Sequence, residues 1–318
     1  MGRIFVRTEI LQRPGTKLTF VIALAALLRF WGLGTKQLWL DEILQLLHSR
    51  PDSLRGILEG VAQDRGGAPL DYLVQHVFIS NLHGVIEWTA RFHAALFGVL
   101  AVWLVYLVCQ ALFNNPRWSL AAAVLLCFYP FHHHYSQEGR PYSLFLTLTL
   151  ILCLIFIRSL KRNDWIIWGS FAVVALMAFY THAYTAIVLF GQLLFLIYHQ
   201  HLTRESRSAV IRRGACFLFC SAIAAAAYVP WLRYSFSNAK GGAPPGNGFR
   251  LFFELIKGLG DGSYPLAFAI ILCAAAGVYH LKQTQRSLEL GALLFWILTP
   301  FPLILAILTW RNYFFASR

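Results

Sequence analysis

The stretch LTFVIALAALLRFWGLGTKQLWLDEILQLLHS, residues 18–49, joins a long apolar run to a short segment that carries two adjacent carboxylates. Its first part, residues 18–34, has the length and composition of a helix that crosses a bilayer. Asp41 and Glu42 follow at the depth where hydrocarbon gives way to headgroups and water. Ionisable side chains at membrane depth are rare and usually functional, so the pair raises the question of what these acids do there.

Apolar runs of similar length recur along the whole chain. Hydrophobic residues make up 58% of the 318 residues and charged residues only 13%, which is typical of a polytopic membrane protein. The net charge of +13 does not indicate nucleic-acid binding, because Lys and Arg are not gathered on a soluble domain. The six cysteines lie in apolar segments without metal-ligand spacing, so we expect neither disulfides nor a zinc site.

Windows of about 20 residues predict nine membrane-spanning helices. The predicted fold is an all-α polytopic membrane protein in which residues 1–318 form one transmembrane module and residues 35–90 form a long first outer loop. The predicted spans are residues 18–34, 91–113, 118–135, 141–158, 165–182, 184–199, 212–232, 264–281 and 288–309.

The distribution of Lys and Arg sets the predicted orientation, because short connectors rich in these residues face the cytoplasm. With nine spans, the N-terminus and the basic connectors all lie on that side. The segment Pro69–His83 is too short and too polar to cross lipid, and we expect it to lie in the interface as an amphipathic helix. Most of the fourteen acidic residues then fall on the outer side, where we expect any chemistry to take place.

The segment Leu38–His48 is predicted to form a short helix with one narrow polar stripe. Asp41, Gln45 and His48 recur at i, i+4 and i+7 on an otherwise apolar cylinder. Either an interfacial helix shows this stripe to water, or the stripe is turned toward a functional site. Glu42 lies about 100° around the helix axis from Asp41, so the two acids need not share one role.

The segment FHHHYSQEGRPYS, residues 131–143, is predicted to turn at the outer end of the third span. Pro141 suits the first position of the next helix. Gln137, Glu138 and Arg140 fill the turn before it. This is either an ordinary turn or an anion-binding seat, since a guanidinium and the N–H groups of a helix N-terminus attract the same charge. Three consecutive histidines on a helix do not converge on one metal ion.

Two further polar turns are expected at the same face. Asp64 and Arg65 precede the interfacial helix, next to glycines that permit close backbone approach. His182 and Tyr184 occupy a short turn between two spans, although both residue types are also ordinary interface anchors. The convergence of these groups at one depth indicates a reactant with a polar head and a lipid tail.

Six motifs then point to a known superfamily by their order and spacing. They are LWLDE, APLDYLVQH, ARFHAALFGVLAVWLVYLV, YSQEGRPYSL, YTHAYT and YVPWL. Between about residues 18 and 235 the chain resembles the membrane glycosyltransferases that use polyprenyl-phosphate sugars, the protein mannosyltransferase and lipid A aminoarabinose-transferase group with the C-type glycosyltransferase fold. It departs from the group where Gly67-Ala68-Pro69 replaces His-Pro-Pro and where Asp71-Tyr72 replaces paired tyrosines. Relatives also usually continue past the WRNYFFASR end, so we expect a short or truncated member.

The resemblance implies inverting transfer of a sugar from a polyprenyl-phosphate donor to an acceptor hydroxyl, with Asp41 as the catalytic base. Arg140 is expected to stabilise the departing phosphate, with Arg65 and Arg311 as further candidates. The other residues expected to bind substrate are Glu42, Asp64, Gln137, Glu138, Tyr142, His182 and Tyr184. The sequence requires no cofactor and no metal, although a divalent cation near Asp64 is compatible with it. It does not identify the acceptor.

The expected location is a bacterial inner membrane with the site facing the periplasm, because eukaryotic relatives are typically longer. Two other functions stay open. A transporter or flippase of lipid-linked sugars would place ionisable residues within spans, whereas here only Arg29 lies clearly inside one. A non-catalytic membrane assembly protein with a degenerate transferase fold is the second alternative.

Overall fold

The computed structural model describes residues 15–64, 67–82, 84–203, 206–238, 248–300 and 303, and every regular element within these ranges is helical. The helices are α1 (Thr16–Phe30), α2 (Leu40–Ser49), α3 (Leu54–Gln63), α4 (Pro69–Asn81), α5 (Ile86–Phe113), α6 (Pro116–Phe128), α7 (Pro130–Ser136), α8 (Tyr142–Lys161), α9 (Trp165–Phe179), α10 (Thr185–Thr203), α11 (Arg207–Asn238), α12 (Gly248–Leu259), α13 (Tyr264–Gln283) and α14 (Ser287–Leu293), followed by one π-helical segment, η1 (Leu294–Leu298). The predicted all-α class is confirmed for the described residues.

Five of the helices in the described ranges are long and apolar enough to cross a membrane: α5, α8, α10, α11 and α13. The predicted span at 165–182 corresponds to the shorter apolar helix α9. The predicted span at 288–309 begins with α14 and η1, and its part beyond residue 300, except residue 303, lies outside the described residues. The first predicted span corresponds to α1, which has 15 residues. The chain is therefore a polytopic helical protein, and the count of nine spans is not confirmed.

The predicted single span at 118–135 is wrong, because the chain forms two helices there. Pro130 has no N–H to donate to Leu126 and ends α6 just before it. Arg29 of α1 supplies replacement donors: its Nη2 donates to the Leu126 carbonyl at 3.2 Å and its Nη1 to the Cys127 carbonyl at 3.4 Å. The His132 Nδ1 lies 2.7 Å from the same guanidinium. The fully buried Arg29 thus fixes the break between α6 and α7.

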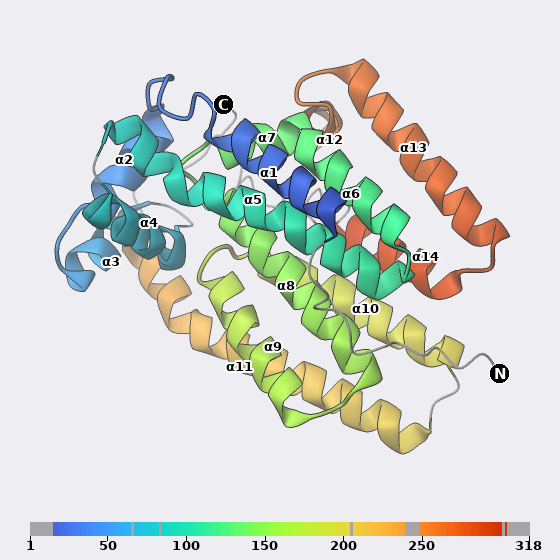
Figure 1. Ribbon diagram of the computed structural model, residues 1–318. Helices are drawn as coiled ribbons and strands as arrows, with labels where there is room; N and C mark the ends of the chain where they lie inside the picture. The colour runs from blue at the N-terminus through green and yellow to red at the C-terminus, as the bar shows by residue number, and fades with distance from the viewer. Residues whose placement is uncertain are drawn as a thin grey trace.

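The long helices pack side by side as a bundle, with α5 between α1 and α6 on one side and α8 on the other (Figure 1). Helices α9 and α11 pack against each other, and α9 also packs against α8. The largest core cluster is built around buried phenylalanines of these helices and α10: Phe156, Phe171, Phe195 and Phe217. Their mutual contacts hold the half of the bundle that follows α8.

Helices α2, α3 and α4 gather at one end of the bundle, beside the first turns of α5 (Figure 1). The polar stripe of α2 faces inward: Asp41 is 5% exposed and Gln45 is fully buried. Leu40, Leu44 and Leu47 are exposed instead. The alternative that this stripe faces water is therefore wrong, because the neighbouring helices carry the partners that the polar groups need.

Replacement of Arg29 by Leu is expected to destabilise the protein. It removes the donors to two buried carbonyls, and each buried group left without a partner costs about 1–3 kcal/mol. Thermal unfolding of the purified protein in detergent would measure the loss. Arg212→Leu is the matched control, because Arg212 is exposed and exposed substitutions usually change stability by less than about 0.5 kcal/mol. Equal melting temperatures for the two variants would contradict the role given to Arg29.

Candidate functional site

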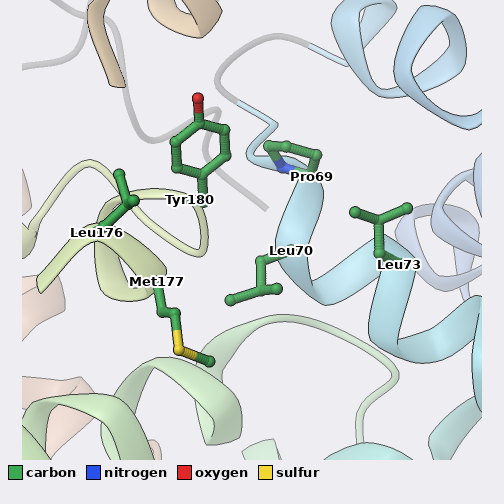
Figure 2. A pocket seen from close by; sticks show the side chains of 6 residues that line it. All are labelled: Pro69, Leu70, Leu73, Leu176, Met177 and Tyr180. Atoms are coloured by element: carbon green, nitrogen blue, oxygen red, sulfur yellow. The ribbon is translucent and has the colours of Figure 1, made fainter. Parts of the chain in front are cut away.

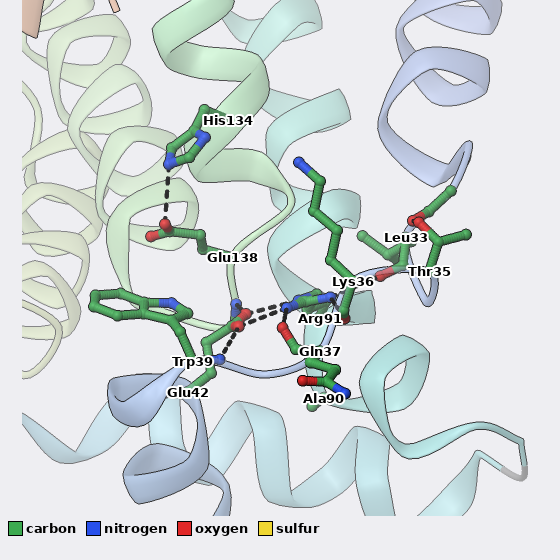
Figure 3. Close-up of polar contacts among 12 residues, drawn as sticks. Leu33, Thr35, Lys36, Gln37, Trp39, Glu42, Ala90, Arg91, His134 and Glu138 are labelled. Carbon is green, nitrogen blue, oxygen red and sulfur yellow. Dashed lines mark hydrogen bonds and ion pairs between the residues drawn. The ribbon is translucent and has the colours of Figure 1, made fainter. Parts of the chain in front are cut away.

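The centre of this end of the bundle is a buried ion pair between Glu42 of α2 and Arg91 of α5. Arg91 donates from Nε to Oε1 at 2.7 Å and from Nη2 to Oε2 at 2.6 Å, so the pair is bidentate (Figure 3). The Arg91 guanidinium also donates to three carbonyls of the connector between α1 and α2: Leu33, Lys36 and Gln37. One side chain thereby fixes the path of the chain from α1 into α2.

Glu42 also binds the turn that precedes α8. The Gly139 N–H donates to Glu42 Oε1 at 2.8 Å, and the Trp39 N–H donates to Oε2 at 3.3 Å. A Cβ on Gly139 would lie 2.9 Å from the Ala90 carbonyl oxygen, so only glycine permits this approach. With four protein donors on a carboxylate that is 0% exposed, Glu42 is occupied by the protein itself.

The first two residues of the same turn are also tied to the protein. Gln137 Nε2 donates to carbonyls at the end of α1, at 3.1 Å from Arg29 and 2.9 Å from Trp31. The Glu138 carboxylate lies 3.1 Å from His134 Nε2, as Figure 3 shows. Burial raises the pKa of Glu138, and the nearby Glu42 adds to this while His134 opposes it.

Arg140, the cation of the turn, extends toward α2. Its Nη1 donates to Gln45 Oε1 at 3.2 Å and to the Asp41 carbonyl at 3.4 Å. The same nitrogen lies 3.7 Å from Asp64 Oδ2, which accepts a 2.5 Å bond from the Tyr72 hydroxyl. Burial alone would lower the pKa of Arg140, but Tyr72, Asp64 and other neighbours outweigh it and raise the pKa. Arg140 is therefore a fixed cation beside the backbone of Asp41.

A second layer of buried polar groups lies beneath Arg140. Gln45 Nε2 donates to Asp71 Oδ2 at 2.5 Å, and His93 Nε2 lies 3.4 Å from the same oxygen. All three side chains are 0% exposed. They come from α2, α4 and α5, so this layer joins the three helices below the site.

The predicted turn at His182 and Tyr184 lies close enough to Arg140 for the charge of the guanidinium to affect the pKa of His182. Burial, followed by the charge of Arg140, lowers the pKa of His182 to about 4, so this ring is neutral near pH 7. The Tyr184 N–H donates to His182 Nδ1 at 3.2 Å. Tyr142, at the start of α8, is 37% exposed and lies among the groups that raise the pKa of Arg140. Among these residues, Tyr142 hydrogen-bonds to Arg140.

An open apolar groove of about 200 Å³ lies between the start of α4 and the end of α9 (Figure 2). Leu70 and Tyr72 are about 200° apart on α4, so the groove and the Tyr72–Asp64 contact lie on different sides of that helix. The Leu70 N–H donates to the Tyr180 carbonyl at 2.8 Å, which holds the two walls together. The groove is lined by Pro69, Leu70, Leu73, Leu176, Met177 and Tyr180.

The structure brings part of the predicted site together around α2: Asp41, Glu42, Asp64, Glu138 and Arg140. Tyr142 hydrogen-bonds to Arg140, Gln137 binds the end of α1, and His182 and Tyr184 lie in the turn between α9 and α10. Arg65 and Arg311 lie outside the described residues. The polar groups of Glu42 and Gln137 bind other parts of the protein, namely Arg91 and the end of α1. Their contacts with substrate stay predictions. Within the described part of the chain, no group of three or more His, Cys, Asp or Glu side chains is arranged to hold a metal ion.

Sequence reasoning missed the groups that hold the site together. Arg91 stood within the ARFHAALF motif, but nothing local distinguished it from an interface arginine. Gln45 was recognised in the α2 stripe without its partner. Asp71 and Tyr72 stood in the APLDYLVQH motif and in a segment too polar for lipid, but no partner was predicted for either. That polarity was the available signal that buried polar partners lay nearby.

Comparison with known protein families identifies the class to which this helical membrane protein belongs. The family model for dolichyl-phosphate-mannose-protein mannosyltransferases matches residues 68–234, more than half of the 318 residues. The chain belongs to the dolichyl-phosphate-mannose-protein mannosyltransferase family, and is thus an integral membrane protein of a glycosyltransferase family. The expected resemblance is confirmed. A comparison with curated proteins gave no match.

Replacement of Glu42 by Gln is expected to destabilise the site end strongly. It leaves the buried Arg91 without its counter-charge, and breaking a buried pair in this way costs about 3–5 kcal/mol. Urea or thermal unfolding in detergent would measure the change. Glu59→Gln is the matched control, because Glu59 pairs with Arg55 at 2.7 Å on the surface and exposed pairs contribute at most about 1 kcal/mol. A Glu42→Gln variant as stable as this control would overturn the role of the pair.

Proposed function

We propose that the protein transfers a sugar, with inversion, from a polyprenyl-phosphate donor to an acceptor hydroxyl at the outer membrane face. One observation carries the proposal: the Arg140 guanidinium donates to the backbone carbonyl of Asp41 at 3.4 Å. This bond ties the turn that carries the proposed phosphate-binding cation to the first turn of α2, which carries the proposed base. Membership of the mannosyltransferase family supports the same reaction class.

Asp41 is the proposed general base. The donor already carries a good leaving group, whereas the acceptor hydroxyl is a poor nucleophile until a base takes its proton. Asp41 lies in the first turn of α2, and its backbone is fixed because the adjacent Glu42 is locked by Arg91. Asp41 is 5% exposed, so an acceptor hydroxyl that reached this carboxylate would meet it with little surrounding water.

Arg140 is the proposed cation for the departing phosphate. As the bond to the anomeric carbon breaks, charge gathers on the phosphate oxygens, and a fixed cation in a water-poor site stabilises that charge best. The guanidinium has five donors, and its Nη1 is held by Gln45 and by the Asp41 carbonyl. The Tyr72 and Tyr142 hydroxyls also hydrogen-bond to the guanidinium, so the phosphate would bind beside these two tyrosines.

The remaining predicted contacts fit secondary roles. Tyr142, His182 and Tyr184 lie on the Arg140 side and would contact the sugar or the phosphate. The apolar groove between α4 and α9 has a lining that suits an isoprenoid chain, but it lies on the other side of α4 from the Tyr72–Asp64 contact and is not part of the proposed donor site. A divalent cation near Asp64 is not needed for this mechanism. The proposed setting is a bacterial inner membrane with the site open to the periplasm.

Replacement of Asp41 by Asn keeps the size of the side chain but removes the base. Transfer from a radiolabelled polyprenyl-phosphate sugar by the purified protein is expected to fall by roughly 10²- to 10⁴-fold. Asp52→Asn is the control, because Asp52 is exposed and is expected to leave the rate unchanged. A fully active, correctly inserted Asp41→Asn protein would remove Asp41 from the reaction. Wild-type protein that moves the labelled lipid across vesicles without transfer would identify a flippase instead.

Replacement of Arg140 by Lys keeps the charge but loses the planar fork. Since a hydrogen bond to a charged group is worth about 1.5–3 kcal/mol, we expect kcat/KM for the donor to fall roughly 10- to 100-fold. Arg162→Lys is the control, because Arg162 has a side chain 76% exposed and pairs with Asp164 at the surface. Unchanged donor kinetics in Arg140→Lys would exclude Arg140 from phosphate binding.

A further inference from the structure

Asp71 carries a buried carboxylate that the proposed reaction does not use. It lies in the first turn of α4 and is 0% exposed. Its Oδ2 accepts the 2.5 Å bond from Gln45 Nε2 and lies 3.4 Å from His93 Nε2. Burial of a charged group is energetically unfavourable unless a specific partner compensates it. For Asp71 that partner is the amide of Gln45.

The amide of Gln45 has only one orientation that satisfies both of its neighbours. An ionised carboxylate can only accept hydrogen bonds, and a guanidinium can only donate them. Asp71 therefore requires the amide nitrogen of Gln45 on its side, and Arg140 requires the amide oxygen on the other. The observed bonds, Nε2 to Asp71 and Oε1 from Arg140 at 3.2 Å, match this requirement.

We infer that Asp71 and Gln45 are positioning residues, which aim the Arg140 guanidinium through a chain of two hydrogen bonds. The inference rests on the proposed function, because the position of Arg140 matters for the rate only if Arg140 receives the departing phosphate. Asp71 sets the orientation of Gln45, and Gln45 holds one edge of the guanidinium beside the Asp41 backbone. A misplacement of about 1 Å at such a group can lower a rate 10²-fold.

Single substitutions are expected to break the chain in two different ways. In Asp71→Asn the new amide no longer dictates which end of Gln45 faces it, so the Gln45 amino group can turn toward Arg140, where donor meets donor. In Gln45→Glu the new carboxylate still accepts from Arg140 but lies against the carboxylate of Asp71. We expect each variant to lower kcat roughly 10- to 100-fold, with little change in the KM for the donor.

The double variant Gln45→Glu with Asp71→Asn is the decisive test. Its carboxylate at position 45 accepts from the amide at 71 and from Arg140, so the hydrogen-bond chain is restored with the two functional groups exchanged. We expect kcat to recover to within a few-fold of the wild type, a non-additive result that neighbouring sites show only when they interact. A kcat for the double variant at or below that of the worse single variant would overturn the inference.

Thermal unfolding of the same proteins separates positioning from a purely structural role. Gln192→Ala is the matched control, because Gln192 is a fully buried glutamine of α10 that contacts Cys153, and truncation of a buried side chain leaves a cavity. We expect it to lower the melting temperature while kcat per folded molecule is kept. If the Asp71 and Gln45 variants likewise lost only stability at unchanged kcat, they would be structural and the inference would fail.

The outcomes also distinguish this inference from the proposed function. Transfer by the wild type without rescue in the double variant overturns the positioning role alone. If the wild type transfers no sugar, the proposed reaction is overturned, and the positioning role with it. A double variant that still recovers its melting temperature would then show only that the hydrogen-bond chain exists. Rescue of both kcat and stability supports the two together.

Discussion

Glu42 and Arg91 form an ion pair that is almost completely removed from solvent, and the geometry of the whole site depends on it. Two charges buried together need a precise arrangement and additional hydrogen bonds, since each has lost its hydration. Here Arg91 also donates to three carbonyls of the 33–37 connector, and Glu42 also accepts from Gly139 and Trp39. The pair thus joins α2, α5, the exit from α1 and the turn before α8 at one point.

This arrangement gives the two adjacent acids different surroundings. Neighbouring residues on a helix point about 100° apart: the Glu42 carboxylate meets Arg91, while the backbone carbonyl of Asp41 accepts a hydrogen bond from Arg140. Glu42, which is held by Arg91, fixes the backbone of the adjacent Asp41, the residue proposed to act as base. Arg140 joins the same arrangement from the turn, because its guanidinium donates to the Asp41 carbonyl, so the guanidinium and the backbone of Asp41 keep a fixed relation.

The rest of the bundle serves to bring these segments to one end. Pro130 breaks the predicted third span, and the buried Arg29 supplies donors at the break. Gln137 then ties the turn to the last carbonyls of α1. Since both contacts involve α1, the helix that leads into the α2 segment also determines where the Arg140 turn lies.

The sequence alone determined the features that depend on neighbouring residues. Hydropathy indicated most of the apolar helices, helical periodicity revealed the stripe of Asp41, Gln45 and His48, and the motifs indicated the family. Tertiary structure decided the direction of that stripe and the partners of its members. Glu42 meets Arg91 across 49 positions and Gln45 meets Asp71 across 26. No local pattern encodes such pairs, because they form only when separate helices exclude water from between them.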